Sequence, residues 1–161
     1  MLDYLGIFKE FNKKKIKYIV AGGMAVNFYG VPRMTYDIDL LLDMQDMNLK
    51  KFLLLMKKWG FKPKVPVAIM DFADRKKRQE WIKNKNMKAF NLVNPAWAIS
   101  EIDVIIDSPI NYTKASKHSR MIILNNVPVP TISKNDLILM KRAAARKQDK
   151  DDIENLKKTM K

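Results

Sequence analysis

Residues 33–42 run Arg-Met-Thr-Tyr-Asp-Ile-Asp-Leu-Leu-Leu, and every second residue at the start of this stretch is apolar. Because successive side chains of a strand point to opposite faces of a sheet, the pattern predicts a β-strand. One face carries side chains that we expect to be buried, namely Met34, Tyr36, Ile38, Leu40 and Leu42. The other face carries a polar row made of Arg33, Thr35, Asp37 and Asp39.

Asp37 and Asp39 are the unusual members of that row. Same-face neighbours on a strand lie about 6.6 Å apart, so two carboxylates there can turn toward one shared point. Left alone, they repel and raise each other's pKa, and a divalent cation removes this penalty. Mg²⁺ typically takes one or two protein carboxylates and leaves its other positions to water and phosphates. The alternative is a strand that faces solvent with two ordinary aspartates.

The segment before this strand strengthens the metal-site interpretation. Residues 17–21 are expected to form a short buried strand, which Gly22 and Gly23 end, and residues 24–29 to form a helix. Glycine lets a backbone approach a phosphate closely, and the first N–H groups of a helix are free to bind an anion. A Gly-Gly pair is also a common turn. Next to Asp37 and Asp39, it predicts a triphosphate cradle beside a metal site.

The remaining elements follow from periodicity and capping. We expect helices over residues 2–14, 46–59 and 71–84, a helix after Ser133, and a last helix from about Asp149 to the end. Strands are expected over residues 87–93 and 101–107. A hairpin is expected within 121–131, with its second arm, which contains Pro128 and Pro130, at a sheet edge. This order predicts one α/β (α+β) domain, residues 1–161, with a single mixed sheet flanked by helices and with residues 133–161 packing on it as C-terminal helices.

Composition limits the chemistry. The chain has no cysteine and only one histidine, His118, so thiolate sites, disulfides and zinc sites with several histidines are excluded. Any bound metal needs oxygen ligands, which favours Mg²⁺ or Mn²⁺. The net charge of +14 favours polyanionic partners such as nucleotides or RNA, although a solvated lysine-rich surface would give the same value. His118 is expected on the surface.

The expected location is cytoplasmic. No apolar run reaches the roughly 18 residues that a membrane span needs. The first residues, Met-Leu-Asp-Tyr, also lack the basic and then apolar layout of a signal peptide.

Two blocks of the sequence resemble a known family. The first is Gly22-Gly23-x-Ala25, Gly30 and Arg33-x-Thr35-x-Asp37-Ile38-Asp39-Leu40, and it resembles the signature of polymerase-β-like nucleotidyltransferases. Within that superfamily the chain is most similar to the AbiEii-type group, which includes toxins of phage-defence and toxin–antitoxin systems. The second block, Lys141-x-x-Ala144-x-Arg146-x-x-Asp149-x-x-Asp152, resembles that group's C-terminal motif. The motif's second lysine is replaced by Gln148, with Lys147 beside it.

The resemblance implies the nucleotidyltransferase fold and a set of site residues. It implies that Asp37, Asp39 and a third carboxylate on a later strand hold the metal and carry catalysis. Asp103 is our choice for the third, although Glu101 and Asp107 share its face. Contact with the nucleotide is implied for Gly22, Gly23, Arg33, Thr35, Lys141 and Arg146. Lys141, Arg142 and Arg146 are expected to divide two tasks, phosphate binding and holding Asp149 or Asp152, and Arg33 to bind phosphate or pair with the site aspartates.

The implied function is metal-dependent transfer of a nucleoside monophosphate from an NTP to an acceptor hydroxyl, with release of pyrophosphate. The positive charge favours RNA, including a tRNA end, as the acceptor, with a protein hydroxyl as the other candidate. An aminoglycoside acceptor is disfavoured because it is itself a cation. The alternative from another class is a catalytically silent nucleotide- or RNA-binding module that acts as a toxin–antitoxin partner. Gln148 argues for that alternative, and the three carboxylates argue against it.

Overall fold

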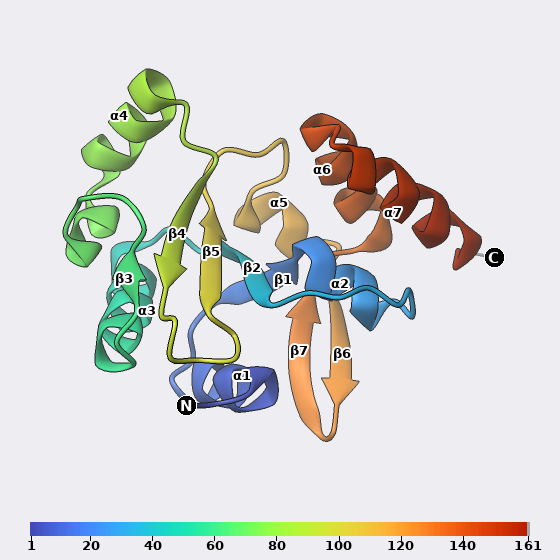
Figure 1. The fold of residues 1–161 in the computed structure, drawn as a ribbon, viewed down its shortest axis with the longest axis horizontal. Coiled ribbons are helices and arrows are strands. Elements are labelled where there is room, and N and C mark those ends of the chain that lie inside the picture. Colours follow the sequence, from blue (N-terminus) through green and yellow to red (C-terminus); the bar gives the residue numbers. More distant parts are fainter. Residues whose placement is uncertain (161) are drawn as a thin grey trace.

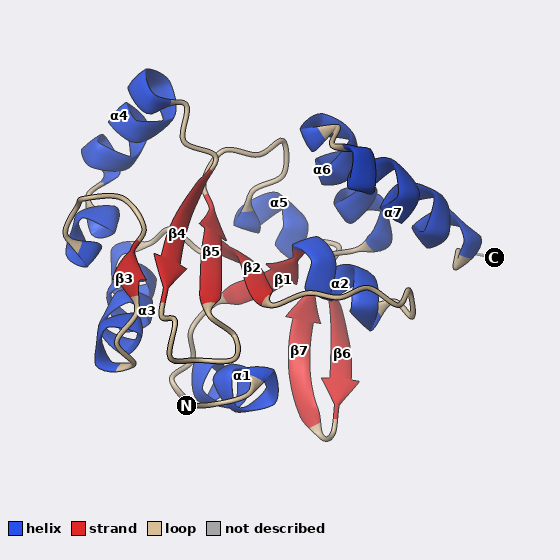
Figure 2. Cartoon of the chain, viewed as in Figure 1, coloured by secondary structure: helices blue, strands red, loops and turns tan. Residues whose placement is uncertain are grey.

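The computed structural model describes residues 1–160, and its centre is one seven-stranded mixed sheet (Figures 1 and 2). The strands are β1 (Tyr18–Ala21), β2 (Asp37–Leu42), β3 (Lys62–Pro63), β4 (Ala89–Val93), β5 (Glu101–Ile105), β6 (Arg120–Leu124) and β7 (Val127–Thr131). Their order across the sheet is β3-β4-β5-β2-β1-β7-β6. The predicted α/β class with a single mixed sheet is confirmed.

Seven α-helices and one 3₁₀ helix flank the sheet within the described residues. They are α1 (Tyr4–Lys13), α2 (Gly22–Phe28), α3 (Asp46–Lys58), η1 (Ile69–Ala73), α4 (Arg75–Lys85), α5 (Tyr112–Ser116), α6 (Lys134–Ala144) and α7 (Lys147–Lys158). Helices α6 and α7 lie against each other (Figure 1). The end of the chain at Lys161, to which the last helix was expected to extend, lies outside the described residues. No helix within residues 1–160 is long and apolar enough to cross a bilayer.

Helices α1 and α3 cover the apolar face of the central strands. Tyr18 of β1 is in register with Leu42 of β2, so the two side chains point to the same face. Phe8 of α1 stacks on Tyr18 with ring centroids 5.8 Å apart, and Phe11 meets both Tyr18 and Phe52 of α3. Side chains alternate along β2, so Asp37 and Asp39 point away from this aromatic core, to the other face.

Local signals placed several elements correctly. The Asn125–Asn126 turn between β6 and β7 has positive φ at both residues, 45° and 66°, as a two-residue hairpin turn requires. The Ser133 side chain accepts a hydrogen bond of 3.1 Å from the backbone N–H of Asp136 and so caps α6.

Strand β2 is shorter than predicted. It begins at Asp37 and not at Arg33, and Met34 and Tyr36 are 78% and 63% exposed, so their predicted burial is wrong. The neighbouring strands explain the limit. β1 ends at Ala21 opposite Asp39, and β5 begins at Glu101 opposite Asp37, so residues 33–36 have no strand beside them to pair with.

The prediction that the proline-containing hairpin arm forms a sheet edge is wrong. That arm is β7, which lies between β1 and β6, and β6 forms the edge. Pro128 and Pro130 are tolerated there because the ladder between β7 and β1 is short, with Val20 opposite Thr131 as its register pair. The prolines lie before that contact.

Candidate active site

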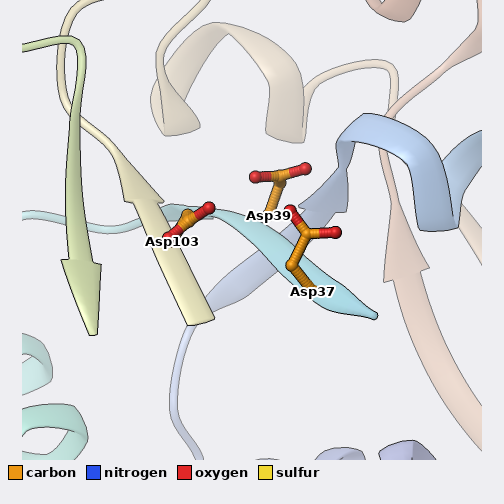
Figure 3. A group of neighbouring side chains, drawn as sticks. All are labelled: Asp37, Asp39 and Asp103. Atoms are coloured by element: carbon orange, nitrogen blue, oxygen red, sulfur yellow. The ribbon is translucent and has the colours of Figure 1, made fainter. Parts of the chain in front are cut away.

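Three aspartates meet on the face of the sheet that α1 and α3 leave free. Asp39 of β2 stands directly opposite Asp103 of β5 in a parallel ladder, and Asp37 lies one same-face step from Asp39 (Figure 3). One carboxylate oxygen from each residue lies within 4.8 Å of the other two. The structure therefore brings together the three carboxylates proposed from the sequence. The two alternatives to Asp103 pair elsewhere: Glu101 with Lys64 at 3.1 Å, and Asp107 with Lys88 at 2.6 Å.

The aspartate cluster carries negative charge that its surroundings do not balance. Burial, and then the charges of Asp37 and Asp103, raise the pKa of Asp39 to about 7. Burial is also the main cause that raises the pKa of Asp103 to about 6. Among residues 1–160, none of the three aspartates forms a salt bridge. Three close carboxylates without a salt-bridge partner fit a divalent cation that prefers oxygen ligands.

Gly22 makes room for Asp39. It is the first residue of α2, its φ is +64°, and a Cβ added to it would lie 1.9 Å from Oδ2 of Asp39. A side chain at this position would therefore displace the carboxylate. Gly23 has a similar but looser role, because its added Cβ would lie 3.1 Å from Cζ and Nε of Arg33. Nucleotide contact by the two glycines stays a prediction.

Arg33 pairs with a different acid from the ones expected. Its Nη1 donates to Oδ2 of Asp152 on α7, so the expected salt bridge to the aspartates of β2 is wrong. The Nε of Arg33 is buried, and no hydrogen-bond acceptor for it lies within the described chain. The arginine thus joins the loop that leads into β2 to the C-terminal helices.

Lys141 lies in a buried ionic network between α6 and α7. Its Nζ lies 3.3 Å from Oδ1 of Asp149 and 2.9 Å from Oδ2 of Asp152, and all three residues are buried. Arg146 also binds Asp149, through Nε at 3.0 Å, but its side chain is 73% exposed. The positive charges of Arg146 and Lys141 lower the pKa of Asp39, which is consistent with both lying close to the aspartate cluster. Of the two, Arg146 is the more accessible to a ligand.

Two further side chains orient the carboxylates. Thr35, for which we expected nucleotide contact, donates from Oγ1 to Oδ1 of Asp37 at 2.8 Å. Asn91 of β4 donates from Nδ2 to Oδ1 of Asp103 at 2.7 Å, and this bond favours the ionised form of Asp103. The sequence interpretation missed Asn91. Its signal was a polar residue between Phe90 and Leu92 in a predicted strand, which places it on the opposite face from those core residues.

His118 lies on the surface as predicted. Its side chain is 69% exposed, and its Nδ1 lies 3.7 Å from Oδ2 of Asp136. It is not among the residues that meet at the cluster.

Known structures share this fold, whereas no family profile and no curated protein sequence matches the chain. The lincosamide antibiotic adenylyltransferase LnuA, solved with lincomycin bound, is 19% identical, with a TM-score of 0.65 over 96% of this chain and 94% of LnuA. ANT(2'')-Ia in complex with adenylyl-2''-tobramycin is 12% identical, with a TM-score of 0.62 over 96% of this chain and 86% of that protein. A Thermotoga maritima protein described as a nucleotidyltransferase is 14% identical, with a TM-score of 0.55. The chain therefore has the fold of nucleotidyltransferases.

Proposed function

We propose that the protein is a metal-dependent nucleotidyltransferase that moves a nucleoside monophosphate from an NTP to an acceptor hydroxyl. The observation that carries this proposal is the cluster of Asp37, Asp39 and Asp103, with one oxygen of each within 4.8 Å of the others. The shared fold supports it independently, since the similar structures include two antibiotic adenylyltransferases. Membership of the AbiEii-type group, and with it a toxin–antitoxin role, is a narrower proposal that rests on the two sequence blocks.

Asp37, Asp39 and Asp103 would hold Mg²⁺ or Mn²⁺ through their carboxylate oxygens. When bound, such ions stabilise negative charge on the attacking and leaving oxygens of a phosphoryl transfer. Thr35 keeps the Asp37 carboxylate in place, and Asn91 does the same for Asp103. Both bonds reduce the movement of the ligands, which is the usual task of residues behind a metal site.

The transfer step exchanges one phosphorus–oxygen bond for another. The acceptor hydroxyl oxygen bonds to the α-phosphorus, the bond from that phosphorus to the bridging oxygen of pyrophosphate breaks, and pyrophosphate leaves. Asp103 takes the hydroxyl proton. Gly22 and Gly23 would offer backbone contact to the phosphates, and the exposed Arg146 side chain would bind their charge. The buried Lys141 would contribute mainly by holding α7 in place through its salt bridges to Asp149 and Asp152.

RNA or a protein hydroxyl is the favoured acceptor. The chain carries a net charge of +14, and a polyanion would be attracted over long range. A small-molecule hydroxyl is a second candidate, because this chain matches 94% of the length of LnuA, which was solved with the antibiotic lincomycin. A cationic aminoglycoside remains disfavoured on charge.

A transfer assay tests the proposal. The protein would be incubated with each α-labelled NTP, Mg²⁺ or Mn²⁺, and total RNA, cell protein or a panel of small hydroxyl compounds. Asp39→Asn removes one cluster carboxylate with little change in shape. Asp107→Asn is the matched control, because it removes an exposed carboxylate that pairs with Lys88 outside the cluster. We expect label transfer by the wild type and by Asp107→Asn, and transfer at least 100-fold slower by Asp39→Asn.

Each outcome has a definite meaning. The labelled fraction identifies the acceptor class. Metal-dependent NTP binding without transfer to any acceptor would favour the silent binding module over the enzyme. An absence of both NTP binding and transfer would refute the site.

A further inference from the structure

A cavity lies at the carboxyl ends of β2 and β5, the two strands that carry the aspartates. It has a volume of about 430 Å³, and its walls include the last residues of β2 and β5, the first two turns of α4 and the start of α5. Leu41 and Ile105 line it and lie one same-face step, about 6.6 Å along the strand, beyond Asp39 and Asp103. In open α/β sheets, ligands commonly bind outside the carboxyl ends of the strands. The volume is within the usual range for small-molecule sites.

Arg78 is the notable residue in this cavity. It is only 8% exposed, yet no carboxylate of residues 1–160 lies within 4.0 Å of its guanidinium. Within the described residues, its one side-chain hydrogen bond runs from Nη1 to the backbone carbonyl of Phe72, at 2.6 Å. The guanidinium also lies 5.5 Å from the centre of the Phe72 ring. These contacts hold the arginine in place but leave its charge without a partner.

The surroundings increase that imbalance. Arg75, one turn earlier on α4, also lines the cavity, and its charge adds to the effect of burial in lowering the pKa of Arg78. The charges of Asp46 and Asp74 act in the opposite direction but from beyond salt-bridge distance. A buried guanidinium without a paired anion is rare, because desolvation of a charge is expensive unless it is matched. A ligand anion would supply the missing partner.

The other walls suit a ligand with an apolar body. Leu41, Met44, Ile105, Ile106 and Ile110 line the cavity. The one lining carboxylate, Asp43, is already engaged, since it lies 3.9 Å from Nζ of Lys17 and accepts from the backbone N–H of Gln45 at 3.2 Å. The cavity thus offers a positive end beside α4 and an apolar remainder.

We propose that this cavity binds a small organic anion, in which a phosphate monoester or a carboxylate pairs with Arg78 and an apolar body lies on the isoleucines. None of the three aspartates of the cluster lines this cavity. The inference does not depend on the proposed transfer activity.

Phenyl phosphate and benzoate are suitable probes, with uncharged benzyl alcohol as the comparison. Binding to the full-length protein would be followed in EDTA by the methyl NMR signals of its isoleucines. We expect shifts at Ile105, Ile106 and Ile110 but not at Ile7, which is buried in α1 on the other face of the sheet. The anions should bind at least about tenfold more tightly than benzyl alcohol. The stronger of the two anions identifies the favoured headgroup.

Arg78→Met keeps most of the side-chain length and removes the charge. We expect it to weaken anion binding by about tenfold or more, whereas Arg120→Met, which removes an exposed charge on β6, should leave the affinity unchanged. Thr113→Trp alters an exposed residue of the cavity wall and should block the site even if Arg78→Met fails to fold. The proposal is overturned if neither anion shifts the three cavity isoleucines, if Thr113→Trp leaves binding intact, or if folded Arg78→Met binds as tightly as the wild type. Shifts of the same three methyl groups on addition of ATP and Mg²⁺ would overturn the separateness of the site.

Discussion

Gly22 and Asp39 are packed so closely that a Cβ on the glycine would lie 1.9 Å from Oδ2 of the aspartate. The end of β1 and the middle of β2 are antiparallel neighbours here, with Ala21 opposite Asp39. The absence of a side chain at Gly22 therefore determines where a central carboxylate of the candidate site can lie. This contact gives the glycine a role that is separate from any contact with phosphate.

We expect Gly22→Ala to displace Asp39 and to weaken Mn²⁺ binding. Because misplacement of a reacting group by about 1 Å can slow a reaction by on the order of 100-fold, transfer should fall by a similar factor. Calorimetric titration with Mn²⁺ and the labelled-NTP assay would measure the two effects. Gly30→Ala is the matched control, since Gly30 also has a positive φ (+88°) but no atom lies within 4 Å of its added Cβ. Equal metal affinity for the two variants would contradict the prediction.

The pH dependence of stability should reveal the pKa of Asp39. Its pKa rises from an ordinary 3.8 to about 7 in the folded chain. A carboxyl with a raised folded pKa favours folding when it is protonated. Its contribution is complete below about pH 4 and is lost as the pH rises to about 7. In EDTA, the wild type should therefore lose on the order of 5 °C in Tm relative to Asp39→Asn across this range.

Thermal unfolding at a series of pH values would test this difference. Mn²⁺ should restore the Tm of the wild type at pH 7 but not that of Asp39→Asn. Asp107→Asn should retain the wild-type pH profile, because Asp107 lies outside the aspartate cluster. Parallel pH profiles for Asp39→Asn and the wild type would show that Asp39 titrates normally.

Removal of the buried amine of Lys141 should destabilise the fold. Lys141→Met would leave Asp149 and Asp152, which are 1% and 5% exposed, without their central cation. Breaking a buried ionic network in this way should lower the free energy of unfolding by about 3 kcal/mol. Urea unfolding would measure it. Lys77→Met is the control, since the pair of Lys77 with Asp71 is largely exposed and its loss should leave the urea midpoint unchanged.

Asn91 should affect metal binding and transfer through its hydrogen bond to Asp103. Asn91→Ala removes the 2.7 Å hydrogen bond to Asp103, and this bond favours the ionised carboxylate. We expect metal affinity and transfer to fall by about 10- to 100-fold. The measured loss should be larger at pH 6 than at pH 8, because the pKa of Asp103 rises when the bond is lost. Asn91→Asp tests the direction further, since a fourth carboxylate would raise the pKa of Asp103 more strongly. An equal loss at pH 6 and pH 8 would show that the hydrogen bond does not act through the pKa of Asp103.

The C-terminal motif, residues 141–152, forms an ionic network between α6 and α7. The structure joins Lys141, Arg146, Asp149 and Asp152 in one network. Arg142, which was expected to share their tasks, is exposed and forms no salt bridge within residues 1–160. The motif did not show that Asp152 also binds Arg33, which is 119 residues away in the chain. That link connects α7 to the loop before β2. It depends on the relative placement of two elements, which no local pattern encodes.

The sequence by itself determined most of the helices and strands, and the faces of β2 from Asp37 onward. The alternation after residue 36 determined that Asp37 and Asp39 share one side of a strand whose other side is buried, and the Asn-Asn pair and Ser133 determined a turn and a helix start. These features depend on residues a few positions apart, whose backbone preferences act locally.

Only the tertiary structure decided which remote residues meet. The register of β2 with β5 placed Asp103 opposite Asp39, and the ion pairs of Glu101 and Asp107 with lysines left Asp103 as the third carboxylate. The register of β4 with β5 brought Asn91 to it. The order of the strands placed the proline arm inside the sheet, and the lack of neighbouring strands before Asp37 made β2 begin there. Register and strand order follow from how the whole core packs, because a shift of one residue would turn every buried side chain outward.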